Sequence, residues 1–166
     1  MSTLPRSHRR AARGAALALT LLLAAPATGT ALAAPAAADP GDIAVGDCFN
    51  SAADVKDYKT DEVARGPSSV DIVPCGQPHQ SEAFAVVTLP EGPFPGDKKI
   101  ISLANEKCGA KEVAAYAGAG AKIPDTMAVY FYLPTSATWD QGERRITCFL
   151  ADSAGRTAGS VRVGAS

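Results

Sequence analysis

The 166-residue sequence has few of the groups from which most enzyme sites and metal sites are built. It contains two histidines, and only His79 lies beyond the first 33 residues. Its four cysteines are separated by 26, 32 and 39 residues, so no C-x2-C pair is available for the close ligand pair typical of tetrahedral metal sites. None of the serines lies in a G-x-S-x-G nucleophile elbow. We therefore expect no catalytic residue, no metal and no cofactor.

The sequence also lacks an apolar run long enough to cross a membrane. A spanning helix needs about 20 apolar residues, whereas the run over residues 15–25 is interrupted by Pro26. Arginines precede this run and Ala31-Leu32-Ala33 follows it, which is the order of a secretory signal peptide with an A-x-A cleavage site. We expect residues 1–33 to be a signal peptide, and the mature chain to be secreted or associated with the cell wall, without a membrane span.

Beyond the expected signal peptide there is no excess of basic residues. Four of the 16 lysines and arginines lie within residues 1–33, whereas all 17 acidic residues follow them. The mature chain therefore has five more acidic than basic residues, a net charge of about −5. Nucleic acids and anionic lipids attract basic patches. We expect neither nucleic acid nor a membrane surface as a partner.

The cysteines that are present indicate disulfides. Cys48, Cys75, Cys108 and Cys148 are even in number, and an export signal would bring them to an oxidising compartment. Three pairings are possible, and the sequence alone does not choose among them. We expect Cys48–Cys75, which would tie the N-terminal segment to a short strand, and Cys108–Cys148, which would join a helix to a late strand.

Local patterns predict a domain of strands with one main helix. Residues 34–41 are rich in Ala and Pro and predict a linker, residues 54–69 predict a surface loop, and residues 42–166 are enough for a single domain. Strands are expected over residues 70–73, 82–89, 127–133, 145–151 and 160–163. Because the strands do not alternate regularly with helices, the fold class is α+β, a small antiparallel sheet with one main helix packed on a face, stapled by two disulfides.

The main helix is expected over residues 100–116, which are rich in Ala, Lys and Glu and contain no proline. Gly118-Ala119-Gly120 would end it. At helical spacing, one face carries Ile101, Ala104, Cys108 and Ala115. We therefore expect Cys108 to point inward.

Two polar clusters are candidates for function. His79 and Glu82 lie where a turn enters a strand, and an imidazole beside a carboxylate could serve as a general base. Trp139, Asp140 and Arg144 form the second cluster, in which the indole could stack on a sugar or anchor a protein. A structural role explains each cluster without a ligand. His79 would be a hydrogen-bonded turn residue, and Trp139 would be buried in the hydrophobic core. We favour the structural interpretation of both.

Three motifs occur in a characteristic order. They are V-G-D-C at 45–48, V-P-C-x-x-P-H-x-x-E at 73–82 and W-x-x-G-E-R-x-x-x-C at 139–148. Together they resemble the actinobacterial secreted septum formation domain. The resemblance implies an exported or envelope protein linked to cell division, and no enzymatic activity comes with it.

Three functions remain open on this basis. The leading hypothesis is a non-catalytic module, secreted or associated with the cell envelope, that binds an envelope protein or a cell-wall glycan. The alternative is a small extracytoplasmic hydrolase or metal-dependent enzyme that uses His79 with Glu82 and Asp140. A purely structural domain is the third. An enzyme needs His79 and at least two further polar groups in one concave pocket, whereas a binding module needs an exposed apolar patch.

Overall fold

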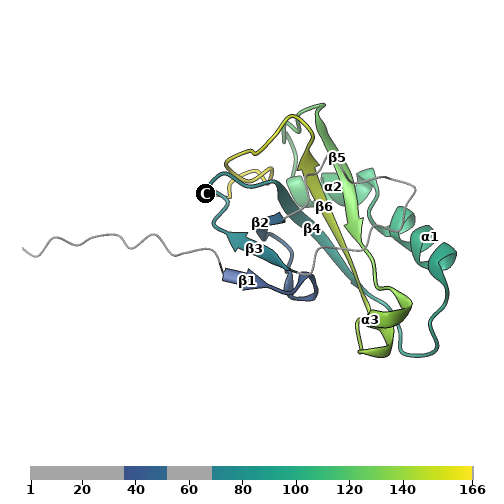
Figure 1. Cartoon of the computed structure of the whole chain (residues 1–166). Coiled ribbons are helices and arrows are strands. Elements are labelled where there is room, and N and C mark those ends of the chain that lie inside the picture. Colours follow the sequence, from purple (N-terminus) through teal and green to yellow (C-terminus); the bar gives the residue numbers. More distant parts are fainter. Residues whose placement is uncertain (1–35, 52–68, 166) are drawn as a thin grey trace, which may run out of the picture. The chain divides into compact units, whose positions relative to one another are not determined.

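The computed structural model describes residues 36–51 and 69–165 (Figure 1). The expected signal peptide and residues 54–68 of the expected loop lie outside the described residues. The elements are, in order, β1 (Ala36–Ala38), the 3-10 helix η1 (Pro40–Asp42), β2 (Cys48–Ser51), β3 (Val70–Val73), β4 (Ser81–Thr88), α1 (Asp97–Lys107), α2 (Ala110–Ala117), β5 (Met127–Tyr132), α3 (Ser136–Asp140) and β6 (Arg145–Asp152). The α+β class predicted from the sequence is confirmed.

The strands form one antiparallel sheet in the order β1-β3-β2-β4-β6-β5. The long strands β4 and β6 pair from Ser81 with Ala151 to Thr88 with Arg145, with one register shift between Ala83 and Ala85. In contrast, β2 pairs only with the first two residues of β4. The sheet therefore has a long half, β4-β6-β5, and a short half, β1-β3-β2, which joins it at the start of β4 (Figure 1).

Strand β6 is buried on both faces because each face of the long half carries its own core. Side chains alternate along a strand, so Ile146 and Leu150 join α1 and α2 in one hydrophobic cluster, while Phe149 belongs to another on the opposite face. In that second cluster Phe149 packs against Phe49 of β2 and Tyr132 of β5, with ring centroids 5.4 and 4.6 Å away. The burial of both faces explains why apolar residues occur at neighbouring positions 148–151 and do not alternate with polar ones.

The prediction of a single helix over residues 100–116 is wrong, because the structure has two helices there. α1 ends at Lys107 and α2 begins at Ala110, and Gly109 between them is extended, with φ −81° and ψ 177°. Glycine favours such a break because it is a weak helix former. The buried residues of the two helices are Ile100, Ala104, Val113 and Ala117. Ala115, which one continuous helix would turn inward, is exposed.

Two expectations at the ends of the domain are also corrected. Residues 36–38, expected to be linker, form β1 against β3. The edge of β3 offers N–H and C=O groups that β2 does not use, and residues 36–38 pair with them. Residues 160–163, expected to be a strand, form a bend and a turn, because the amide of Val161 donates to the Glu82 carboxylate and not to a neighbouring strand.

The two disulfides are the expected pair, Cys48–Cys75 and Cys108–Cys148. The first joins the start of β2 to the turn after β3, and the second joins the end of α1 to the middle of β6. Both connect segments that the sheet and helix layers bring side by side, so they close long loops of the chain. No helix within residues 36–51 and 69–165 is long and apolar enough to cross a membrane.

Candidate functional site

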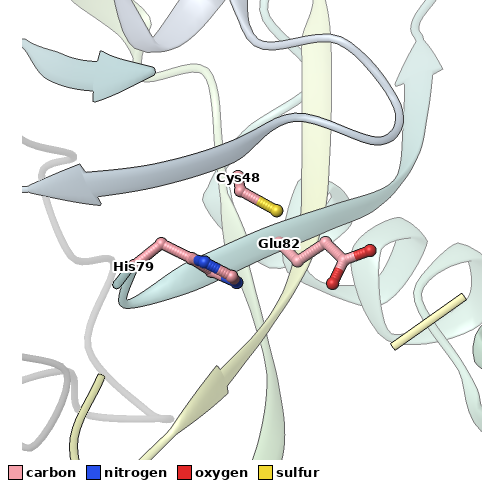
Figure 2. Close-up of side chains that lie close together, drawn as sticks. All are labelled: Cys48, His79 and Glu82. Atoms are coloured by element: carbon pink, nitrogen blue, oxygen red, sulfur yellow. The ribbon is translucent and has the colours of Figure 1, made fainter. Parts of the chain in front are cut away.

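His79 and Glu82 lie together at the start of β4, beside the Cys48–Cys75 disulfide (Figure 2). The Cys48 sulfur, a His79 ring nitrogen and a Glu82 carboxylate oxygen all lie within 4.8 Å of one another, and the three residues are buried. Sheet register explains this arrangement, because Cys48 of β2 pairs with Glu82 of β4. The structure therefore assembles the first predicted pair and adds a disulfide sulfur to it.

The His79 ring is held by the main chain. Its Nδ1 lies 2.8 Å from the carbonyl oxygen of Gln77. A carbonyl can only accept, so Nδ1 carries the proton and donates it. The backbone of His79 also exchanges hydrogen bonds of 2.8 and 2.9 Å with Thr157. A side chain that is only 2 % exposed and held in this way has no access for a substrate, which supports the turn role.

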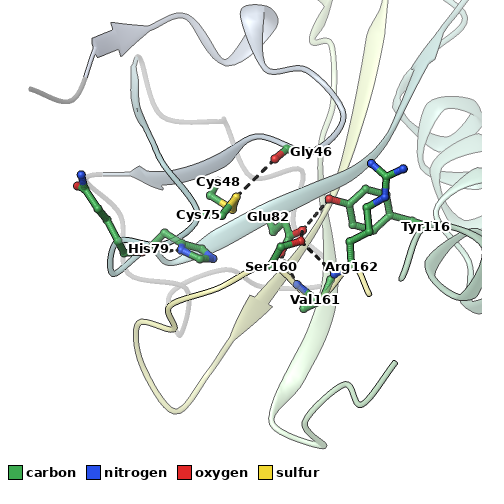
Figure 3. The surroundings of a disulfide bond; sticks show 10 residues. Gly46, Cys48, Cys75, His79, Glu82, Tyr116, Ser160, Val161 and Arg162 are labelled. Carbon is green, nitrogen blue, oxygen red and sulfur yellow. Dashed lines mark hydrogen bonds between the residues drawn. A yellow bond between two sulfur atoms is a disulfide. The ribbon is translucent and has the colours of Figure 1, made fainter. Parts of the chain in front are cut away.

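The Glu82 carboxylate connects β4, α2 and the segment that follows β6 (Figure 3). Its Oε1 accepts from the Tyr116 hydroxyl of α2 at 2.6 Å and from the Ser160 hydroxyl at 2.5 Å, and its Oε2 accepts from the Val161 amide at 2.8 Å. Burial, followed by the hydrogen bond to this carboxylate, raises the pKa of Tyr116 well above its ordinary value. Glu82 is thus the anchor that holds the C-terminal segment and α2 on β4.

The second predicted cluster is also built into the fold. Trp139 is 5 % exposed, and its Nε1 donates to the carbonyl oxygen of Gly92 at 2.8 Å. The guanidinium of Arg144 lies over the indole, 4.0 Å from its centroid, and donates to the Trp139 carbonyl at 2.6 Å. Phe94 packs edge-on against the same ring at 5.7 Å. Trp139 is therefore part of the hydrophobic core, whereas Asp140 at the end of α3 is exposed.

The two clusters lie at opposite ends of β4. Glu82 is near its start, whereas the amide of Leu89, just past its end, donates to the carbonyl of Arg144. At about 3.3 Å per residue, the strand separates them by more than about 20 Å. Asp140 consequently cannot converge with His79 and Glu82, and the constellation required by the enzyme alternative does not form in the described residues.

A groove of about 1110 Å³ lies at the Trp139 end and was not expected from the sequence. We call it the α3 groove, because α3 forms one wall, while the η1 segment, the start of α1, the end of β5 and the start of β6 form the others. Its lining includes Asp39, Asp97, Gln141, Glu143, Arg145 and the aromatic residues Phe94 and Tyr132. Of the predicted site residues, none lines it.

Three charged groups of the α3 groove, those of Asp39, Glu143 and Arg145, are held by the main chain. Glu143 Oε1 accepts from the Arg145 amide at 2.6 Å, Arg145 Nη2 donates to the Ile43 carbonyl at 2.7 Å, and Asp39 Oδ1 accepts from the Gly41 amide at 2.8 Å. A Cβ at Gly41 would lie 2.5 Å from Glu143 Oε2 and 3.0 Å from Asp39 Oδ1. Glycine therefore lets both carboxylates approach the chain at this point.

The sequence carried weak signals for this groove. Arg145 opens a strand that is mostly apolar, and a charge at that position indicates a partner or an open surface. Asp39 and Gly41 belong to the segment expected to be a linker, so their part in the groove depended on a fold of that segment that was not predicted.

Comparison with known proteins gave one result. The model of a family described as septum formation matches residues 38–148, a range that contains both disulfides and both polar clusters. The family is not known for catalysis. No match was found among curated proteins or solved structures. Because the matched range covers more than half of the 166 residues and has the disulfide framework on which the fold depends, the chain belongs to the septum formation family.

Proposed function

We propose that this domain is a non-catalytic, exported module of the cell envelope that acts in septum formation by binding a cell-wall glycan in the α3 groove. Membership of the septum formation family supports the septal role. Two disulfides are typical of proteins in an oxidising compartment, which supports export. The observation that carries the binding role is the α3 groove, an open surface lined by both polar and apolar groups.

The side chains that could act as general acids or bases are already held by hydrogen bonds within the domain, which supports a binding role. The Glu82 oxygens receive three hydrogen bonds from within the domain, and the His79 ring is buried and bonded to the main chain. The carboxylates of the α3 groove also serve the fold, since Glu143 holds the Arg145 amide and Asp39 holds the Gly41 amide. Groups fixed in this way are suited to recognising a ligand.

The lining of the α3 groove favours a glycan over other partners. Sites for small molecules typically occupy about 300 to 1,000 Å³, so a groove of about 1110 Å³ has room for more than one sugar ring. Asp97, Gln141 and Arg145 offer hydrogen-bond partners to hydroxyl and amide groups, while the partly exposed ring of Phe94 provides an apolar surface for a sugar. Three carboxylates against one guanidinium disfavour an anionic polymer.

The experiment that tests this function blocks the groove without removing a polar contact. Ala137 is an exposed residue of α3 that lines the groove, so Ala137→Trp would fill it. Ala114→Trp is the matched control, because Ala114 is exposed on α2 outside the groove. Binding is measured by cosedimentation with protein-free cell-wall glycan and by titration with soluble oligomers of N-acetylglucosamine.

We expect the wild-type domain and Ala114→Trp to bind with equal affinity and Ala137→Trp to bind at least ten-fold more weakly. Equal binding by the two tryptophan variants would place the glycan elsewhere on the surface. A wild-type domain that binds neither material would overturn the glycan assignment itself.

A further inference from the structure

A second site is present at the opposite end of β4, independent of the α3 groove. We propose that the Cys48–Cys75 disulfide and a zinc ion are alternative cross-links at this place. In the reduced protein, the two cysteine thiolates, His79 and Glu82 bind one Zn²⁺. In the oxidised protein, the disulfide takes the place of the metal. This site would take a divalent ion of borderline softness, for which sulfur, imidazole nitrogen and carboxylate oxygen are the usual protein ligands.

The ligand atoms are already close in the oxidised fold. The Cys48 sulfur, a His79 nitrogen and a Glu82 oxygen lie within 4.8 Å of one another, and the Cys75 sulfur is bonded to that of Cys48. Zinc–ligand bonds of about 2.0 to 2.3 Å place tetrahedral ligands about 3.3 to 3.8 Å apart. The cluster therefore needs to contract by about 1 Å, and breaking the disulfide frees the Cys48 side chain to rotate toward the other two.

His79 has the orientation of a metal-binding histidine. Its Nδ1–H donates to the Gln77 carbonyl at 2.8 Å, which leaves the lone pair of the neutral ring on Nε2. Zinc-bound histidines usually donate their second nitrogen to a carbonyl or carboxylate in this manner. Figure 2 shows the ring projecting from the turn toward Glu82, on the side where the Cys48 sulfur lies.

Glu82 keeps one acceptor position for a cation. Each carboxylate oxygen has two lone pairs, and Oε1 uses both for Tyr116 and Ser160. Oε2 accepts only the Val161 amide among the hydrogen bonds of the described residues. The donors on Oε1 fix the carboxylate as second-layer partners fix a metal ligand.

The redox step balances with a dithiol as reductant. A thiolate of the dithiol attacks Cys75, which is partly exposed whereas Cys48 is 1 % exposed, and forms a mixed disulfide that the second thiol resolves. Two electrons and two protons pass to the protein, giving two thiols, while the dithiol becomes a cyclic disulfide. Zinc then replaces the two S–H protons, which are released to solvent.

The second disulfide provides an internal comparison. Within residues 36–51 and 69–165, the group of Cys48, His79 and Glu82 is the only set of three or more His, Cys, Asp or Glu ligands close enough to hold a metal. Cys108 and Cys148 have no such neighbours among those residues. Reducing both disulfides should therefore create one tight zinc site, not two.

The experiment measures zinc uptake by the exported chain, lacking residues 1–33, before and after reduction with a phosphine that is then removed. We expect one zinc per reduced chain in equilibrium dialysis and none in the oxidised chain. Cobalt(II) should give thiolate charge-transfer and tetrahedral d–d absorption only after reduction. His79→Ala and Glu82→Gln should each weaken zinc binding at least ten-fold, whereas Glu112→Gln, on α2 outside the cluster, should not change it.

A double variant, Cys108→Ala with Cys148→Ala, keeps only the first disulfide and should still bind one zinc after reduction. Circular dichroism of each reduced sample shows whether the domain is folded. Zinc binding that is unchanged in both His79→Ala and Glu82→Gln would mean that cysteines alone hold the ion, and would overturn the site. Absence of zinc from the reduced wild-type chain, or equal binding by the oxidised chain, would overturn it as well.

Discussion

The buried carboxylate of Glu82 allows a sharp test of how the domain is held together. It is 2 % exposed and accepts three hydrogen bonds, from Tyr116, Ser160 and Val161. Those donors come from α2 and from the segment after β6, 34, 78 and 79 residues away along the chain. Replacing Glu82 therefore tests whether one side chain anchors both segments to the sheet.

Two substitutions separate the charge from the hydrogen bonds. In Glu82→Gln, the amide oxygen can still accept from the Val161 N–H, and the NH₂ group can face the Tyr116 and Ser160 hydroxyls, which rotate to accept. We expect a loss of about 1 to 2 kcal/mol, because charge-assisted bonds become neutral ones. Glu82→Leu leaves the amide and both hydroxyls without their acceptor, and we expect a loss of about 3 to 5 kcal/mol.

The assay is urea unfolding of the chain without residues 1–33, followed by the fluorescence of Trp139, which is the single tryptophan and is buried. The midpoint should fall in the order wild type, Glu82→Gln, Glu82→Leu, with an unchanged slope. Glu106→Gln is the control, because its side chain is 64 % exposed, and its midpoint should equal that of the wild type. The reasoning is refuted if Glu82→Leu unfolds at the wild-type urea concentration, or if the glutamine variant loses as much as the leucine variant.

Other elements lead to predictions of the same kind. Replacing Cys108 and Cys148 by alanine removes a cross-link between residues 40 apart, which the chain-entropy model values at about 4 kcal/mol, so the melting temperature should fall clearly. Because burial and Glu82 raise the folded-state pKa of Tyr116 above its usual 10.0, its contribution to stability is complete below pH 10 and is lost as the pH rises through the raised value. Tyr116→Phe should flatten this alkaline decline, measured by unfolding at several pH values. Trp139→Phe removes the hydrogen bond to Gly92 and leaves a cavity, and should lower the free energy of unfolding by about 2 to 3 kcal/mol in a urea titration followed by circular dichroism.

The strands that were predicted correctly are those whose own residues carry the signal. β3, β4, β5 and β6 are runs of β-branched, aromatic and small apolar residues with turn residues beside them, and such runs favour strands wherever they pack. The elements that were missed depend on distant neighbours. β1 is three alanines that become a strand because the edge of β3 is open to them, and residues 160–163 lose strand structure because Glu82 takes the amide of Val161.

The candidate site shows the same division. His79 with Glu82, and Trp139 with Arg144, were predicted as clusters because their members are close in sequence, and the structure brings each pair together. The sequence did not show that Asp140 lies far from His79, because their distance depends on the eight-residue strand β4 that lies between the two clusters. The α3 groove escaped prediction because its walls come from three segments far apart in the sequence, residues 39–41, 94–97 and 132–147.

The sequence by itself determined the fold class, four of the strands, the presence of disulfides and the family, since these follow from local composition, spacing and motifs. The tertiary structure alone decided which side chains meet across long separations. The Glu82 anchor joins residues 34 and 78 positions apart, the α3 groove joins the η1 segment to α3 and β6, and Gly109 divides one expected helix into two. These features depend on strand order and on the packing of layers, and no short stretch of sequence contains that information.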